Sequence, residues 1–275
     1  MEVKNTYVAI KANINGAPEE SNFEIKVENL SRIVEPESKE VVIKNLLVSI
    51  DPYQINRMKS QSSSQTSISY ATAITPGEVI DTYGVGRVLV SHRPDFKKGD
   101  LVVGLLTWGE YTVVKEGSLL NKLDPSLAFP LSYHVGVFGF SGLAAYGGFF
   151  EVCKPKPGEK VFVSAASGSI GHLVGQYAKL LGCYVVGSAG SQEKHTSWPD
   201  VKDIVYKRIR IQGFLAADFM PVYADFLSKT VEYLQDGKLK TIEDISQGVE
   251  SIPSAFIGLF NGDNIGKKIV KVADE

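Results

Sequence analysis

The fold of this chain follows from residues 160–171, which read Lys160-Val161-Phe162-Val163-Ser164-Ala165-Ala166-Ser167-Gly168-Ser169-Ile170-Gly171. The first half of this stretch is apolar and β-branched, which predicts a strand. Apolar residues then recur at helical spacing as far as position 181, at Ile170, Leu173, Val174, Tyr177 and Leu180. Gly182 ends that helix, and residues 183–189 predict a second strand. A strand, a glycine turn, a helix and a parallel strand within ~30 residues predict a βαβ unit.

The glycines between the first strand and the helix favour the binding of a nucleotide. They let the backbone approach a pyrophosphate, whose charge the N–H groups and dipole of a helix N-terminus stabilise. The full G-x-G-x-x-G pattern requires glycine at 166, 168 and 171, so Ala166 makes the match partial. A glycine turn that only packs the helix against the sheet is the alternative.

The end of the second strand indicates which nucleotide binds. An NAD site usually carries Asp or Glu there, to accept hydrogen bonds from the ribose, whereas this chain has Ser188. Small and hydroxylated residues at 187–191 are followed by Lys194, which suits a 2′-phosphate. We therefore expect NADPH/NADP+ rather than NADH. An ordinary solvated surface lysine is the alternative for Lys194.

Short strands predominate before residue 125. Apolar and β-branched runs predict them over 41–50, 84–90, 101–106 and 109–114, with turns between them. Several short strands separated by turns predict a compact, barrel-like domain.

Composition makes several classes of partner improbable. The chain has 29 basic and 31 acidic residues and a net charge of −2, so nothing in it favours nucleic acid or an anionic membrane. Residues 131–150 carry no formal charge and match a membrane span in length. Five glycines and several polar side chains dilute that stretch, so we expect packed helical segments and no membrane association.

Cysteine and histidine usage argues against disulfides and metals. Cys153 and Cys183 are too few for a disulfide framework, and the first residues lack the basic start and apolar run of a secretory leader. A cytoplasmic location is therefore expected. The cysteines and the four histidines show no ligand spacing of a catalytic zinc site, so no metal is expected. His172, beside Gly171, is interpreted as a packing or surface residue.

Several segments together resemble the zinc-free medium-chain reductases. More narrowly, they resemble the plant NADPH-dependent 2-alkenal (double bond) reductases, relatives of the leukotriene B4 dehydrogenase/prostaglandin reductase group. The segments include Asp51-Pro52-Tyr53, Gly142-Leu143-Ala144-Ala145-Tyr146, Val163 to Gly168, Gly187 to Ser191, Lys207 to Phe214 and Gly262 to Lys267. The resemblance covers nearly the whole chain.

This resemblance implies an α/β fold with two domains. A GroES-like, β-rich substrate domain is expected over 1–128, completed by a C-terminal strand within 262–275. A Rossmann-type, doubly wound parallel sheet that binds NADPH is expected over 129–261. The implied reaction transfers a hydride from NADPH to the β-carbon of a small α,β-unsaturated aldehyde or ketone, and a proton then reaches the α-carbon.

The resemblance also implies binding residues, although it assigns no catalytic one. It gives the pyrophosphate to Ala165, Ala166, Ser167, Gly168, Ser169, Ile170 and Gly171. Lys194 would hold the 2′-phosphate, Gly190 would lie beside the ribose, and Asn264 would touch the cofactor. The nicotinamide half would be flanked by Phe214, Leu215 and Ala216. Tyr53 would line the substrate pocket, where it could donate to the carbonyl oxygen as negative charge builds there; a tyrosine packed at a domain edge is the alternative.

The chain departs from the family after Lys194. The family continues there through further βα units, whereas here the domain is shortened between 194 and 205. Only three strands are expected, over 161–165, 184–189 and 205–214, where a doubly wound fold has about six. The segment 209–214 resembles a family strand that extends the sheet across a dimer, so a homodimer is expected. A catalytically inactive homologue that binds nucleotide or dimerises is the alternative to an active reductase.

Overall fold

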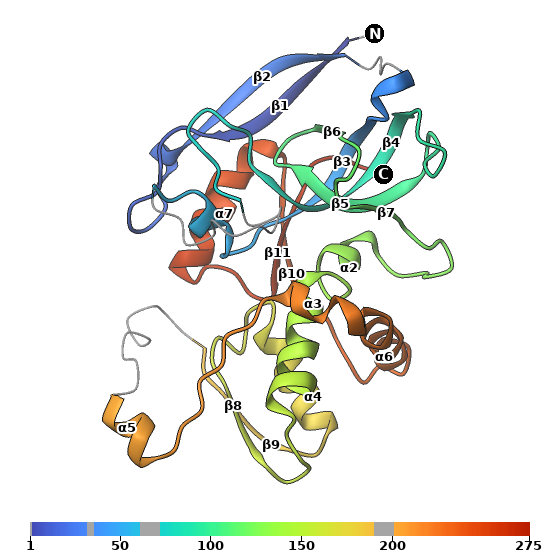
Figure 1. Cartoon of the computed structure of the whole chain (residues 1–275). Coiled ribbons are helices and arrows are strands. Elements are labelled where there is room, and N and C mark those ends of the chain that lie inside the picture. The colour runs from blue at the N-terminus through green and yellow to red at the C-terminus, as the bar shows by residue number, and fades with distance from the viewer. Residues whose placement is uncertain (1, 32–35, 61–71, 190–200) are drawn as a thin grey trace. The chain divides into compact units, whose positions relative to one another are not determined.

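The computed structural model describes residues 2–31, 36–60, 72–189 and 201–275. These residues form two compact units (Figure 1). The first unit comprises Met1–Val135 and Glu243–Glu275, and the second comprises Gly136–Ile242.

The first unit is built on a seven-stranded sheet, in the order β10-β11-β3-β4-β5-β7 with β6 also paired to β3. Its strands are β3 (Val41–Ser49), β4 (Asp81–Ser91), β5 (Leu101–Thr107), β6 (Tyr111–Val114), β7 (Leu120–Lys122), β10 (Glu243–Gln247) and β11 (Lys267–Lys271). Every pair is antiparallel except β10 with β11. A separate antiparallel pair joins β1 (Glu2–Ile10) to β2 (Phe23–Ser31). The strands predicted before residue 125 are therefore confirmed.

The central strand β3 lies among three neighbours and is buried along almost its whole length. Only Lys44 of its nine residues is not buried, which explains why apolar residues occupy both faces of most of this strand. The adjacent strand β4 approaches closely because it carries glycine: a Cβ at Gly86 would overlap the side chain of Ile43.

The helices of this unit are short, and the longest comes from the C-terminal segment. They are α1 (Gln54–Arg57), α2 (Leu131–Val135) and α7 (Ile252–Asn261), with 3-10 turns η1 (Glu20–Asn22), η2 (Pro36–Ser38) and η7 (Val249–Ser251). Phe256 of α7 stacks edge-on to Phe23, with ring centroids 5.9 Å apart, and lies 5.5 Å from the ring of Trp108. The core of the N-terminal strands is thus closed by residues near the C-terminus.

Because of this packing, the boundaries between the two units differ from the expected domain boundaries. Residues 243–261 were predicted to belong with the nucleotide-binding half, whereas β10 pairs with β11 and α7 packs on the N-terminal core. The first compact unit therefore ends at Val135 and resumes at Glu243, in place of the expected boundaries at 128 and 262.

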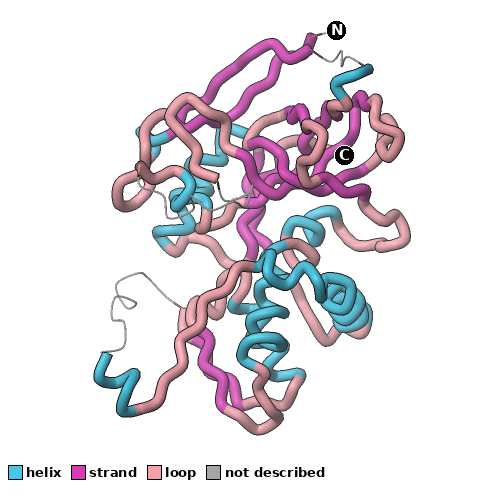
Figure 2. The backbone as a smooth tube through the Cα atoms, viewed as in Figure 1, coloured by secondary structure: helices cyan, strands magenta, loops and turns pink. Residues whose placement is uncertain are grey.

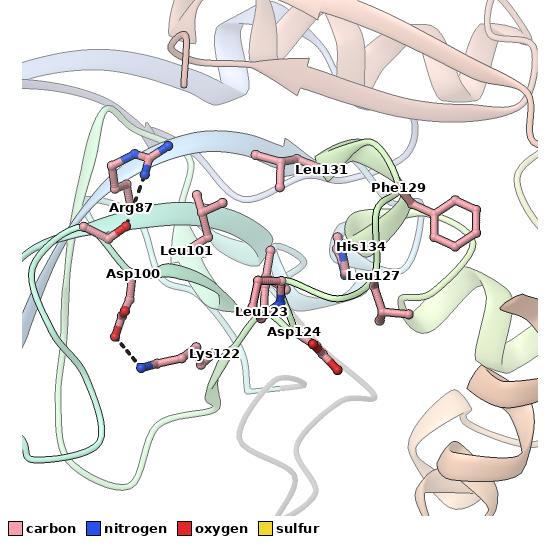
Figure 3. Close-up of a pocket in the computed structure, with 12 residues that line it drawn as sticks. Arg87, Asp100, Leu101, Lys122, Leu123, Asp124, Leu127, Phe129, Leu131 and His134 are labelled. Atoms are coloured by element: carbon pink, nitrogen blue, oxygen red, sulfur yellow. Dashed lines mark hydrogen bonds and ion pairs between the residues drawn. The ribbon is translucent and has the colours of Figure 1, made fainter.

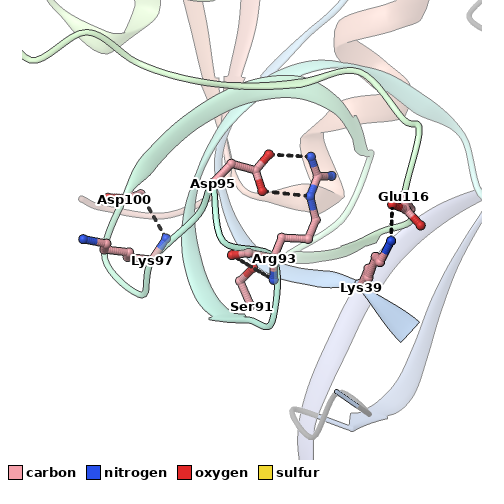
Figure 4. A network of polar contacts seen from close by, with 7 residues as sticks. All are labelled: Lys39, Ser91, Arg93, Asp95, Lys97, Asp100 and Glu116. Carbon is pink, nitrogen blue, oxygen red and sulfur yellow. Dashed lines mark hydrogen bonds and ion pairs between the residues drawn. The ribbon is translucent and has the colours of Figure 1, made fainter. Parts of the chain in front are cut away.

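Ion pairs and a hydrogen bond from backbone to side chain fix the turns between strands of the first unit (Figure 4). Arg93 holds Asp95 through two nitrogens at 3.2 and 2.7 Å. Lys39 pairs with Glu116 at 2.8 Å, and Asp100 accepts the backbone N–H of Lys97 at 2.7 Å. These contacts lie at the surface, so they specify turn geometry more than they stabilise the fold.

The second unit contains the predicted βαβ element (Figure 2). Its elements are α3 (Phe140–Tyr146), the π-helical η4 (Gly147–Cys153), β8 (Lys160–Val163), α4 (Gly171–Leu180), β9 (Tyr184–Gly187), α5 (Val201–Tyr206), η6 (Ala216–Val222) and α6 (Tyr223–Gln235). The strands β8 and β9 are parallel, from Lys160 opposite Tyr184 to Val163 opposite Gly187. The predicted strand, helix and second strand are therefore confirmed, and so is the α/β class.

The predicted third strand over 205–214 is wrong. Helix α5 ends at Tyr206, and residues 207–215 form neither helix nor strand (Figure 2). A strand needs a neighbour with which to share hydrogen bonds, and among the described residues of this unit β8 and β9 pair only with each other.

The uncharged stretch 131–150 forms no single long helix. It is divided among α2, α3 and the first part of η4. In the described part of the chain, no helix has the length and apolar character needed to cross a membrane.

Candidate functional site

The turn between β8 and α4 is an extension of the β8–β9 ladder. The N–H of Ser188 donates to the carbonyl of Val163, and the N–H of Ala166 donates to the carbonyl of Ser188, both at 2.9 Å. The chain then bends sharply, and the N–H of Gly168 donates to the carbonyl of Ala165 at 2.9 Å. The predicted pyrophosphate residues 165–171 thus form one continuous turn that leads into the helix.

Backbone geometry in this turn explains its small residues. Ala165 has a φ of 48°, in the left-handed region that L-residues rarely occupy. A Cβ at Gly171 would overlap the carbonyl oxygen of Ala165, so only glycine fits at the start of α4. The turn therefore has the tight geometry that the glycine pattern predicts.

The alanine at position 166 is accommodated by a glycine on the neighbouring strand. A Cβ at Gly187 would lie 2.7 Å from the Cβ of Ala166. One of these two positions must therefore lack a side chain. In the usual pattern, glycine at position 166 keeps the space between the two strands free. Here Gly187 at the end of β9 leaves that space for the methyl group of Ala166.

Three buried polar atoms around the turn have no hydrogen-bond partner among the residues that the structure describes. They are the Oγ of Ser169, the Oγ of Ser188 and the Nε2 of His172. A buried polar group without a partner is destabilising. A ligand rich in hydroxyl and phosphate oxygens could supply the missing partners, so the residues present fit a nucleotide.

His172 is buried, as expected of a packing residue, and it also contacts the turn. Its Nδ1 lies 2.7 Å from the carbonyl oxygen of Gly168, which also accepts the backbone N–H of His172 at 3.1 Å. Burial lowers the pKa of the His172 imidazole because it disfavours the charged form. The helical spacing of four residues between Gly168 and His172 could have revealed this contact.

Phe214 packs against residues of η4 and η6. Its ring lies 5.3 Å from that of Phe219 and covers Gly148, where a Cβ would lie 2.7 Å from it. Leu215 precedes η6 and is exposed, and Ala216 begins that element. The predicted role of these three residues at the nicotinamide stays a prediction. Gly190 and Lys194 lie outside the described residues, so their predicted roles stay predictions too.

Asn264 and Tyr53 belong to the first unit. The side-chain nitrogen of Asn264 donates to the carbonyl of Gly266 at 3.0 Å. Asn264 lines a small cavity of about 230 Å³ together with Asp244 and Lys268, which pair with each other at 2.7 Å. Its predicted contact with the cofactor is not tested by this arrangement.

Tyr53 caps the start of α1 amid a network of charged side chains. Arg57 pairs with Asp81 at 2.6 Å, and the buried Lys267 pairs with Asp51 at 2.6 Å. The pKa of the Tyr53 phenol is raised, chiefly by burial and then by the Asp51 carboxylate, whereas Arg57 opposes the rise. About a third of the residue is exposed, at 37%. A protonated phenol is able to donate a hydrogen bond to a carbonyl oxygen.

A larger cavity of about 430 Å³ lies elsewhere in the first unit (Figure 3). Its charged side chains are already engaged: Lys122 pairs with Asp100 at 2.7 Å, and Arg87 donates to the carbonyl of Gly99 at 3.1 Å. None of the predicted site residues lines it. We therefore assign it no part in the predicted site.

Within the described ranges, no three His, Cys, Asp or Glu side chains are grouped so that they could hold a metal ion. Cys153 and Cys183 are both free thiols.

Comparison with known proteins places the whole chain in one family. Residues 7–122 match the family model described as the N-terminal domain of oxidoreductase. The 2-alkenal reductase (NADP(+)-dependent) of Nicotiana tabacum is 37% identical, with 100% of this chain and 99% of that protein covered. The (+)-pulegone reductase of Mentha piperita is 33% identical, with 99% and 100% covered. CurA from Vibrio vulnificus, solved in complex with NADPH, matches with a TM-score of 0.82 at 26% identity, over 98% of this chain and 100% of that one.

The same comparison bears on the length of the chain. The alignment with the tobacco enzyme extends over 346 positions, 71 more than the 275 residues of this chain. The relative thus has segments without a counterpart here, although its two ends are matched. With its oxidoreductase N-terminal domain and its full-length match to a 2-alkenal reductase, the chain belongs to the alkenal and prostaglandin reductase group of the medium-chain dehydrogenases/reductases.

Proposed function

We propose that this chain reduces the α,β-carbon double bond of 2-alkenals and enones, with NADPH as the hydride donor. The observation that carries the proposal is the intact turn between β8 and α4, in a chain that matches a 2-alkenal reductase from end to end. The similarity to CurA, whose solved complex holds NADPH, supports the same cofactor. The substrate would be a small molecule.

The residues of the chain would perform two tasks. The turn 165–171 and the N-terminus of α4 would bind the diphosphate, because helix N-termini stabilise anions. Lys194 would bind the 2′-phosphate and so select NADPH over NADH. NADPH, when bound, supplies the hydride that adds to the β-carbon of the substrate.

Tyr53 would act at the substrate carbonyl. As the hydride adds, negative charge develops on the carbonyl oxygen, and a positioned hydrogen-bond donor stabilises it. The raised pKa of Tyr53 keeps its phenol protonated at neutral pH, which suits a donor. A proton then adds at the α-carbon and completes the reduction.

We further propose that the chain forms a homodimer in the cytoplasm. The sequence of residues 209–214 resembles a family strand that extends the sheet across a dimer, and this resemblance supports the dimer although these residues form no strand in the single chain. Free cysteines are consistent with a reducing compartment.

A second candidate function is nucleotide binding without turnover. The two-stranded sheet of the second unit favours it, because Phe162 and Tyr184 on that sheet are about two-thirds exposed, at 68% and 67%. The 71 alignment positions without a counterpart also favour it. Such a chain would keep the diphosphate turn and lack the remainder of an active site.

One experiment separates the two functions. The purified chain is titrated with NADPH by calorimetry, and NADPH oxidation is then followed with an enal such as 4-hydroxynonenal. Oxidation that depends on the enal supports the reductase. Binding without oxidation supports the second function, and the absence of binding by both NADPH and NADP+ refutes both.

A further inference from the structure

We propose that His172 is a positioning residue for the diphosphate-binding turn. Its imidazole fixes the carbonyl of Gly168 and thereby sets the direction of the next amide N–H, that of Ser169. This inference rests on the proposed binding of NADP(H) at the turn, and it goes further by assigning a role to a side chain that the glycine pattern does not contain.

The contact between the imidazole and the turn defines the state of the ring. A carbonyl oxygen can only accept a hydrogen bond, so the Nδ1 atom 2.7 Å from it must carry the proton. The Nε2 atom of the neutral ring is then an acceptor, and it is buried without a partner in the described part of the chain. The lowered pKa of His172 keeps the ring in this neutral form at neutral pH. His172 therefore contributes orientation to the site and no positive charge.

Peptide planarity transmits the effect of this contact. In a trans peptide, the carbonyl of Gly168 and the N–H of Ser169 point in opposite directions. The backbone N–H and the imidazole of His172 both draw that carbonyl toward the body of α4. The N–H of Ser169 must then point away from the helix, in the direction from which an anion approaches a helix N-terminus.

A second side chain of the same helix provides a matched comparison. One turn further along, the Nε2 of Gln176 donates to the carbonyl of His172 at 2.9 Å, again four residues back. Gln176 also bonds the carbonyl and the N–H of Lys240, at 2.9 and 2.8 Å. Replacing Gln176 therefore removes more hydrogen bonds than replacing His172, but none of them involves the turn. Gln176 also demonstrates that a glutamine on α4 can reach a carbonyl four residues earlier.

The test measures binding of two ligands to four forms of the chain. The forms are the wild type, His172→Leu, His172→Gln and Gln176→Leu. The ligands are NADP+ and adenosine 2′-monophosphate, which lacks the diphosphate. His172→Ala, which also removes the donor and favours helix, replaces His172→Leu if the leucine variant does not fold.

We expect His172→Leu to weaken NADP+ binding about fivefold to tenfold, the usual effect of losing one hydrogen bond. His172→Gln restores binding to within about twofold of the wild type, because its amide can donate to the Gly168 carbonyl. Gln176→Leu lowers the melting temperature at least as much as His172→Leu and leaves NADP+ binding unchanged. Adenosine 2′-monophosphate binds all four forms alike.

Two results would overturn the inference while leaving the proposed function intact. One is equal loss of NADP+ binding in His172→Leu and Gln176→Leu. The other is parallel weakening of NADP+ and adenosine 2′-monophosphate, since a purely structural role would affect both ligands. A wild-type chain that binds neither NADP+ nor NADPH would instead refute the proposed function, and the role of His172 with it.

Discussion

The central strand of the first unit and the two strands of the second are buried to very different degrees. In β3, eight of nine residues are buried, because the strand has β4, β6 and β11 as neighbours. In β8 only Val163 is buried, and no residue of β9 is. Burial of apolar area is the main stabilising contribution to a fold. The first unit thus has a complete core, whereas the sheet of the second has one face covered by α4 and apolar side chains on the other.

The largest effect should come from the core of the first unit. Phe256→Ala removes a fully buried ring that contacts Phe23 and Trp108, so we expect the free energy of unfolding to fall by about 3–5 kcal/mol. Urea denaturation measures this loss, with Phe162→Ala in the second unit as the matched control. Phe162 is 68% exposed, so its replacement should change stability by no more than about 0.5 kcal/mol. Equal losses in the two variants would contradict the comparison.

A smaller effect is expected at the turn of the second unit. Gly171→Ala places a Cβ against the carbonyl of Ala165, so it should cost about 1–3 kcal/mol of stability and weaken NADP+ binding about tenfold or more. Gly175→Ala is the control on the same helix, since nothing lies within 4 Å of its added Cβ. That variant should be as stable as the wild type or more stable, with unchanged binding. If both variants bind alike, the close approach at Gly171 is not needed for the nucleotide.

Lowering the pH should change the stability of the two units to different extents. Burial lowers the pKa values of His134 in the first unit and His172 in the second. Each unfolded histidine therefore takes up a proton more readily than the folded one, and stability is lost as the pH falls below about 6.5. Burial also raises the pKa of Glu243 in the first unit, so this carboxyl favours the folded state at low pH and its contribution is lost as the pH rises.

The two contributions of the first unit therefore oppose each other between about pH 4.5 and 6.5. Among the described residues of the second unit, no carboxyl group with a raised pKa opposes the contribution of His172. We expect the protection factors of amides in α4, which are corrected for the intrinsic pH dependence of exchange, to fall more than those in β3 between about pH 7 and 5.5. His172→Leu should abolish this fall in α4 and leave β3 unchanged. An equal fall in both elements of that variant would contradict this assignment.

The smallest change in stability is expected at the exposed face of β8 and β9. Phe162 and Val186 are cross-strand partners and both are exposed, at 68% and 50%. Replacing both with threonine keeps β propensity, so stability should change by less than about 0.5 kcal/mol, while binding of a hydrophobic dye should fall clearly. Ile265→Thr in the first unit, at a single exposed position, should leave dye binding unchanged. Unchanged dye binding in the double variant would show that this face is covered in solution.

Local patterns in the sequence predicted the elements that depend on local contacts. The strand, glycine turn and helix over 160–181 were found because each depends on residues close in the chain. Residues 205–214 form no strand although they resemble a strand of the family, because a strand also requires a neighbour that no local pattern specifies.

Long-range packing explains the other differences. The affiliation of β10 and α7 with the first unit depends on pairing with β11 and on contacts with Trp108, far away in the sequence. In the candidate site, the glycine pattern predicts the tight turn of residues 165–171. The same pattern does not include His172, so it does not predict the hydrogen bond from His172 to the carbonyl of Gly168. The resemblance to a family supplied the remaining residues, of which Tyr53 and Asn264 lie in the first unit and Phe214 in the second.

The contact between Ala166 and Gly187 has a consequence for how such turns are recognised in genomes. Positions 166 and 187 lie on neighbouring strands and share the space that a nucleotide motif requires. Alanine at one of these positions can therefore be compensated by glycine at the other. Mutations at the two sites should then be interdependent during evolution. A search profile that scores both sites jointly would detect relatives that a contiguous signature overlooks.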